Sequence, residues 1–147
     1  MGTVNAVTGS LLYLDANIFI YAVEDVTPHA SRLRPVFQRI DRGELRGASS
    51  ELSLAEVLVK PLRDGAHPVR SQYEQLLSPS GPLTVHPIAR DVLVRAAELR
   101  AAHSSLKLPD AIHAATALLR GCTTFLTNDA RFETVPNLPV LLLSRMP

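Results

Sequence analysis

The sequence predicts a single α/β domain of three layers, with a central parallel sheet between two layers of helices. The main observation is alternation, because short apolar runs of strand length are separated by longer stretches with helical periodicity. The length of 147 residues fits one domain, and a domain of that size buries roughly two-thirds of its unfolded surface. A hydrophobic share of 46% beside 20% charged residues is typical of a folded protein. We therefore expect one domain over residues 1–147, with residues 1–10 flexible.

Five apolar runs are the expected strands. They cover residues 11–14, 45–48, 83–86, 123–126 and 140–143. Each run is short, and each contains the leucine, valine or phenylalanine expected in a strand that is covered on both faces. The proline- and glycine-containing segment 78–82 is the expected loop between a helix and the third strand.

Helical patterns fill most of the gaps between these strands. They are expected at residues 16–24, 28–40, 50–63, 68–77, 89–103 and 109–120. Thr27 is the expected N-cap of the second helix, with Pro28 as its first residue, and Pro61 is expected to bend or end the third. Gly121 suits the position that follows the last helix. The expected inner face of the third helix consists of Leu54, Val57, Leu58 and Leu62. That of the fifth helix consists of Val92, Leu93, Ala96 and Leu99.

Charge and cysteine content narrow the class of function. A net charge of +1 means that any contact with nucleic acid must come from a local basic patch. Most basic residues are arginines, whose planar fork suits phosphate oxygens. Cys122 is the single cysteine, so it forms neither an intramolecular disulfide nor a cysteine-based zinc site, and we expect a small, buried residue in a reducing compartment.

The sequence was also compared with the features of a signal peptide and of a membrane span. The first ten residues show neither the basic start nor the apolar stretch of a signal peptide. No apolar run approaches the ~20 residues of a membrane span. We therefore expect a cytoplasmic protein that does not insert into membranes.

Four acidic residues stand where an apolar segment meets a loop or the start of a helix: Asp15, Glu56, Asp110 and Asp129. Asp15 and Asp129 follow two strands, and in an open parallel sheet the ligand crevice lies beyond the carboxyl ends of the strands. The other two lie near helix starts that can face the same crevice. Carboxylates that gather there repel one another unless a cation neutralises them, and oxygen ligands favour Mg²⁺ or Mn²⁺. The pattern predicts metal-assisted hydrolysis of a phosphodiester.

Each acid has a simpler structural explanation as well. Asp15 can cap the following helix, Asp110 can complement a helix dipole, and Asp129 can form a turn with Asn128. Glu56 completes a capping-box pattern that begins at Ser53. Glu51 is a less constrained rival for its metal-binding role.

At these residues the chain resembles the PIN-domain family, especially the VapC-type toxins. The resemblance rests on four segments in the order and approximate spacing of that family, within residues 12–143. The segments are residues 14–21 (LDANIFIY), 54–58 (LAEVL), 108–117 (LPDAIHAATA) and 126–132 (LTNDARF). It implies a parallel sheet of order 3-2-1-4-5, in which the strands that end near Asp15 and Asp129 are neighbours.

The resemblance also implies a function. It implies an endoribonuclease that depends on Mg²⁺, with Mn²⁺ as a substitute, and that forms the toxin of a type II toxin–antitoxin system. The implied metal-binding and catalytic residues are Asp15, Glu56, Asp110 and Asp129, with Asn17 and Thr127 in supporting roles. The implied substrate is transfer RNA or another structured RNA, and the implied partners are a VapB-type antitoxin and a second copy of the chain.

Other readings stay open at this point. His113 lies three residues after Asp110, so a histidine–carboxylate metal site is conceivable, although packing or a hydrogen bond behind the acids is favoured. Another metal-dependent phosphate-ester hydrolase is an alternative, but a dehalogenase-like phosphatase needs an aspartate at position 17, where this chain has Asn17. A further alternative is a non-catalytic PIN-like module that binds a partner through the apolar helices of residues 16–39.

Overall fold

The computed structural model describes residues 11–146, and the expected flexibility of residues 1–10 concerns residues outside that range. Its five strands form one parallel sheet in the order β3-β2-β1-β4-β5, which confirms the predicted topology. The strands are β1 (Leu11–Leu14), β2 (Arg46–Ser50), β3 (Thr84–His86), β4 (Thr124–Thr127) and β5 (Val140–Leu142). Chain order reverses between β1 and β4, so the crevice that binds ligands in such sheets is expected at their carboxyl ends.

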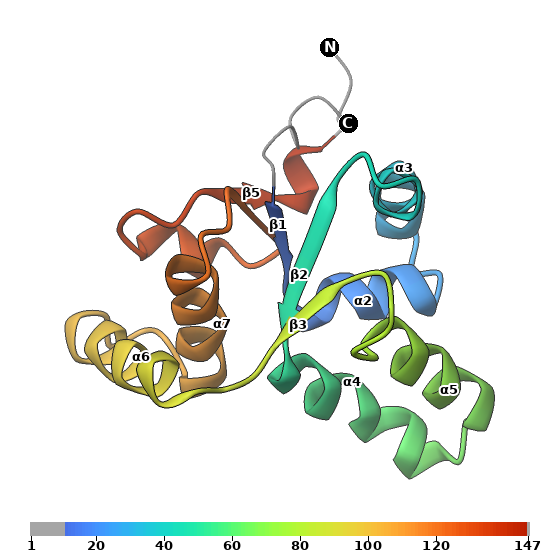
Figure 1. Ribbon diagram of the computed structural model, residues 1–147, viewed down its shortest axis with the longest axis horizontal. Coiled ribbons are helices and arrows are strands. Elements are labelled where there is room, and N and C mark those ends of the chain that lie inside the picture. Colours follow the sequence, from blue (N-terminus) through green and yellow to red (C-terminus); the bar gives the residue numbers. More distant parts are fainter. Residues whose placement is uncertain (1–10, 147) are drawn as a thin grey trace.

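Helices cover both faces of this sheet (Figure 1). One layer contains α2 (Ala16–Val23), α3 (His29–Asp41), α4 (Glu51–Asp64) and α5 (His67–Leu76). The opposite layer contains α6 (Arg90–Ala102) and α7 (Leu108–Leu119). Two short 3₁₀ helices, η1 (Ala130–Thr134) and η2 (Leu143–Arg145), flank β5. The predicted three-layer α/β/α architecture is therefore confirmed.

Alternating residues of the central strands build two separate cores. Leu12 and Leu14 point into the core shared with α2, α3, α4 and α5. Tyr13 lies between them in sequence but belongs to the core of α6 and α7, where its ring stacks on Phe125 with centroids 5.0 Å apart. All of these side chains are fully buried, as expected for a parallel sheet that is covered on both faces.

The second strand differs most from its prediction. It was expected at residues 45–48 but runs to Ser50, through small and polar residues. The buried Ser49 donates a hydrogen bond to the carbonyl of Leu14, 2.8 Å away, so its hydroxyl can lie inside the sheet without loss. Gly47 is needed for space, because a Cβ there would lie 2.5 Å from the side chain of Leu83. Strand length was underestimated because apolar content is a weak guide to such a strand.

Several helix details were also wrong. The helix α3 begins at His29 with Pro28 as N-cap, one residue later than expected. Pro61 does not end α4, which continues to Asp64 and stops at Gly65 in a left-handed conformation. The expected inner residues Leu62 and Leu93 are 51% and 47% exposed. The buried stripe of α4 instead consists of Ser53, Val57 and Pro61, spaced by four residues.

Within residues 11–146, none of the helices has both the length and the apolar character that crossing a membrane requires.

Candidate functional site

A cavity of about 240 Å³ at the carboxyl ends of β1 and β4 is lined by all four predicted acids. Asp15 follows β1, Glu56 projects from α4, Asp110 lies in the first turn of α7, and Asp129 follows β4. The remaining lining residues are Ala16, Asn17, Ile20, His113, Arg131 and Phe132. Four chain segments that are far apart in sequence therefore place carboxylates in one space.

Asp15 is the most buried of the four, with 5% of its surface exposed. As N-cap of α2 it accepts a hydrogen bond from the backbone N–H of Ile18, at 3.3 Å from Oδ1. Its Oδ2 accepts a hydrogen bond from the hydroxyl of Thr127, 2.5 Å away. Burial nevertheless raises the pKa of Asp15 to about 6, and the bond from Thr127 opposes that rise. The ionised form is therefore costly unless positive charge comes near.

Glu56 is held by a chain of two short hydrogen bonds. Its Oε1 lies 2.6 Å from Nε2 of His113, and Nδ1 of His113 lies 2.6 Å from the hydroxyl of Tyr13. Burial raises the pKa of Tyr13 well above its usual value, so the phenol keeps its proton and can donate it to Nδ1. With Nδ1 as the acceptor, the N–H of His113 lies on Nε2 and is donated to Glu56. This arrangement confirms the favoured reading of His113 as a hydrogen-bonding residue behind the acids.

The capping box that was weighed as an alternative role for Glu56 is not formed. The N-cap of α4 is Ser50, whose hydroxyl accepts a hydrogen bond from the backbone N–H of Leu52 at 3.1 Å. Ser53 lies a full turn later and its hydroxyl is bonded to that of Ser49. Glu56 is therefore free of capping and its carboxylate faces the cavity. The rival Glu51 lines a different hollow, beside Leu77 and Pro79.

On the opposite side of the cavity, Asp110 and Asp129 share one guanidinium. Nη2 of Arg131 lies 2.5 Å from Oδ2 of Asp129 and 3.4 Å from Oδ2 of Asp110. This pairing, chiefly the hydrogen bonds from Arg131, lowers the pKa of Asp129 below its usual value. Each aspartate also has a local backbone bond, from the N–H of Lys107 to Asp110 and from the N–H of Arg131 to Asp129. Asp110 therefore bonds to the N-cap residue of α7 and Asp129 caps η1, and these local roles coexist with a position in the cavity.

The donor set fits a hard divalent cation, since it consists of carboxylate oxygens from four elements around one small cavity. In their present conformations, however, no three Asp, Glu, His or Cys side chains among residues 11–146 are arranged to hold a metal ion. Asp110 and Asp129 are turned toward Arg131, while only Oε1 of Glu56 is engaged by His113. Binding an ion therefore requires some of these side chains to leave their present partners.

Of the residues that support the four acids, two were predicted from the sequence and two were not. Thr127 contacts Asp15 directly and Asn17 lines the cavity, so both lie where they were expected. Tyr13 and Arg131 were missed. Tyr13 reads as an ordinary apolar residue of a strand, and only its position opposite His113 shows that its hydroxyl has a role. For Arg131 the signal was its place two residues after Asp129.

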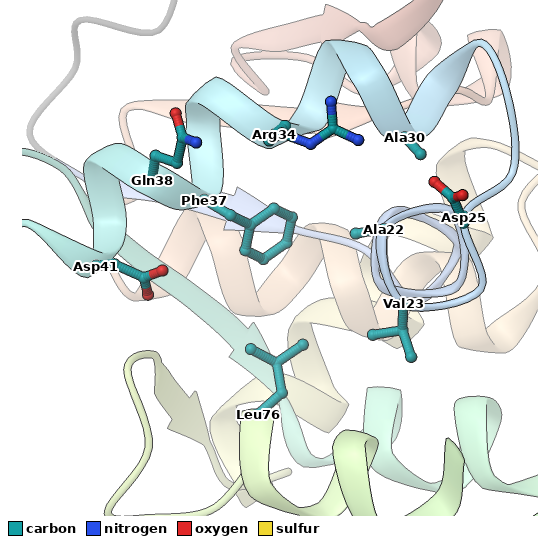
Figure 2. Close-up of a pocket in the computed structure, with 9 residues that line it drawn as sticks. All are labelled: Ala22, Val23, Asp25, Ala30, Arg34, Phe37, Gln38, Asp41 and Leu76. Carbon is teal, nitrogen blue, oxygen red and sulfur yellow. The ribbon is translucent and has the colours of Figure 1, made fainter. Parts of the chain in front are cut away.

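A second hollow, of about 300 Å³, lies between α2, α3 and α5 (Figure 2). Phe37 and Leu76 point into it, and Ala22 and Val23 add to its apolar lining. The charged groups at its rim have mixed signs, with Asp25 and Asp41 beside Arg34. It contains no cluster of acids, so the smaller cavity is the better candidate for chemistry, and this hollow is the better candidate for contact with a partner.

Comparison with known protein families assigns this domain to a family. The family described as PIN domain matches residues 12–138, which is most of the chain. This chain belongs to the PIN-domain family. No curated protein matches it in sequence.

Solved structures of similar fold support this assignment of a PIN domain. The VapBC2 complex of Rickettsia felis, bound to a promoter DNA fragment, is 20% identical with a TM-score of 0.72, over 90% of this chain and 98% of that one. A toxin–antitoxin complex from Klebsiella pneumoniae is 25% identical with a TM-score of 0.67, over 90% and 97%. VapC20 of Mycobacterium tuberculosis, a toxin that cleaves the sarcin–ricin loop, is 14% identical with a TM-score of 0.67, over 83% and 92%. This PIN domain therefore has the fold found in toxin–antitoxin complexes.

Proposed function

We propose that this PIN domain is a Mg²⁺-dependent endoribonuclease, with Mn²⁺ as a substitute ion. The observation that carries the proposal is the convergence of Asp15, Glu56, Asp110 and Asp129 on one cavity at the carboxyl edge of the sheet. These four residues would hold the ion. When bound, it would polarise the scissile phosphate and lower the pKa of the attacking water.

The residues of the chain supply the geometry. Thr127 and the N–H of Ile18 fix the two oxygens of Asp15, while His113 fixes one oxygen of Glu56. Carboxylates that are already oriented lose less conformational entropy when they bind a cation and its substrate. The raised pKa of Asp15 supports the same proposal, because a buried carboxylate that is poorly solvated gains most from a nearby positive charge.

The test is cleavage of labelled RNA with Mg²⁺, with Mn²⁺ and with EDTA. Asp15→Asn and Asp110→Asn should each lower the rate at least about 100-fold, since each removes a ligand whose charge offsets that of the ion. Asp64→Asn is the matched control, because it removes an equal charge at the far end of α4. Cleavage that survives EDTA, or that is unchanged in both site variants, would reject a metal-dependent nuclease.

We further propose that the domain acts as the toxin of a type II toxin–antitoxin system in the cytoplasm, on transfer RNA or another structured RNA. The likeness in fold to VapC20, a toxin that cleaves the sarcin–ricin loop, supports this choice of substrate. Induction should arrest growth, and Asp15→Asn should relieve the arrest. Mapping of RNA ends after brief induction, with the same variant as control, identifies the cleaved RNA. Arrest that persists in Asp15→Asn would contradict the role assigned to Asp15.

A VapB-type antitoxin and a second copy of the chain are the proposed partners. The complexes from Rickettsia felis and Klebsiella pneumoniae contain a toxin with its antitoxin, which supports the first of these. Co-expression with such an antitoxin should restore growth. Sedimentation of the purified chain should give twice the mass of one copy, and a monomer at micromolar concentration would exclude a stable homodimer.

The second candidate is a non-catalytic interaction module. The apolar hollow between α2, α3 and α5 favours it, because α2 and α3 are the helices predicted to contact a partner (Figure 2). Inertness toward RNA together with unchanged partner binding in Asp15→Asn would favour this alternative.

A further inference from the structure

Arg131 is the arginine that lines the acidic cavity, and it enters from η1. Its Nε lies 3.1 and 3.0 Å from the two oxygens of Asp129, and its Nη2 contacts both Asp129 and Asp110. The planar fork therefore pairs with one carboxylate through two nitrogens and reaches a second. Arg131 supplies to these two acids the positive charge that a bound cation would supply.

This pairing places a positive charge where the ion would bind. Oδ2 of Asp110 and Oδ2 of Asp129 both contact Nη2 of Arg131, and a guanidinium at this place repels an incoming cation and takes up lone pairs that would bind it. The absence of any ready ligand group of three among the described residues agrees with this. Arg131 and a cation therefore compete for Asp110 and Asp129.

The contact can open without disturbing the fold around it. The side chain of Arg131 is 43% exposed, so it can move into solvent. Asp129 would keep its bond from the backbone N–H of Arg131, at 2.9 Å from Oδ1, and would remain the N-cap of η1. Asp110 would keep the N–H of Lys107. Both carboxylates would thus stay in place when the guanidinium leaves.

We propose that Arg131 changes partners during the reaction: it leaves Asp110 and Asp129 as they take up the ion, and its guanidinium then binds the RNA phosphate. The inference rests on the proposed nuclease function. An arginine released from the wall of this cavity stays beside the place where a phosphate would bind, and its five N–H donors match phosphate oxygens. Such an arginine stabilises the negative charge on the phosphate oxygens in the transition state.

The proposal predicts opposite effects of one substitution on binding and on chemistry. Arg131→Gln should bind Mn²⁺ about three- to fivefold more tightly, because competition by a partly exposed ion pair is lost. Its rate of RNA cleavage at saturating Mn²⁺, in a single turnover, should fall at least about tenfold. Arg131→Lys should bind Mn²⁺ nearly as the wild type does, yet cleave slowly, because lysine keeps the charge and loses the fork.

The binding experiment uses Mn²⁺ alone, followed by electron paramagnetic resonance, and needs no RNA. Arg120→Gln is the matched control, because it removes another arginine paired with an aspartate, ten residues along α7 and about 15 Å from Asp110. Thermal unfolding without metal verifies that each variant is folded. The control should change neither Mn²⁺ affinity nor cleavage.

Two outcomes would overturn the proposal. Unchanged Mn²⁺ affinity in Arg131→Gln would mean that the guanidinium does not compete with the ion, and undiminished cleavage would mean that it does not serve the phosphate. Asp110→Asn distinguishes a failure of the proposed function from a failure of the proposal about Arg131. If that variant binds Mn²⁺ as tightly as the wild type, the cavity is not the metal site. If Mn²⁺ binding responds as expected but no RNA is cut by the wild type, the nuclease proposal fails while the competition stands.

Discussion

The two sides of the acidic cavity differ in how they hold their carboxylates. Asp15 and Glu56 are held by donors that are themselves buried, namely Thr127, a backbone N–H and His113. Asp110 and Asp129 are held by the charged and partly exposed Arg131. The first side is prearranged by the core, while the second can exchange its partner with solvent. We call Asp15 and Glu56 the fixed wall of the cavity, and Asp110 and Asp129 its adjustable wall.

The largest expected effect concerns the buried charge of the fixed wall. Without metal at pH 8, Asp15→Asn should stabilise the protein by up to about 3 kcal/mol, because the rise in the pKa of Asp15 from 3.8 to about 6 measures how much the fold disfavours its ionised form. Urea unfolding in EDTA measures this. Asp129→Asn is the comparison, since it removes a carboxylate paired with Arg131 and should change stability by less than about 1 kcal/mol. Equal shifts in both variants would erase the distinction between the two walls.

The next effect concerns the support of Glu56. Tyr13→Phe removes the donor to His113 and leaves the stacked ring in place, so it should lower Mn²⁺ affinity or cleavage about tenfold through the orientation of Glu56. Tyr73→Phe is matched to it, because Tyr73 is equally buried and donates to Glu24. Calorimetry with Mn²⁺ and RNA cleavage measure the difference. If both variants lost the same affinity, the loss would reflect general stability rather than the position of Glu56.

A smaller effect is the dependence of stability on pH without metal. The folded pKa of Asp15 lies above its unfolded value, so the fold binds the proton more tightly and gains stability as pH falls through about 6. Between pH 8 and pH 5 this group should add roughly 1 kcal/mol to the free energy of unfolding. Chemical denaturation of the wild type and Asp15→Asn at both pH values isolates the contribution. A difference between the two proteins that does not change with pH would contradict the assignment.

The smallest effect is expected outside the cavity. Asp91 and Arg120 form an exposed pair that joins α6 to α7, with Arg120 pulling the pKa of Asp91 down. Asp91→Asn should leave Mn²⁺ affinity and cleavage at the wild-type values, because water and salt screen such a pair. The same assays provide the baseline. A loss comparable to that of Tyr13→Phe would show that the site is sensitive to charge at long range.

The adjustable wall was predicted only in part from the sequence. Asp129 and Asp110 were recognised as candidates from their places after a strand and in the first turn of a helix. Their pairing with Arg131 was not, because a sequence does not show which way a long side chain turns. The fixed wall was anticipated further, since Thr127 and the role of His113 behind the acids were both expected. Its last member, Tyr13, depends on a strand face that only the packed core reveals.

The sequence by itself determined the α/β class, the five strands in nearly their right places and the four acids, because periodicity and residue type are local properties. The tertiary structure alone decided which serine caps α4, namely Ser50 and not Ser53, and which face of α4 and of α6 is buried. It also decided that the four carboxylates share one cavity, with an arginine between two of them. These depend on contacts between residues far apart in the chain, whose energies no local pattern contains.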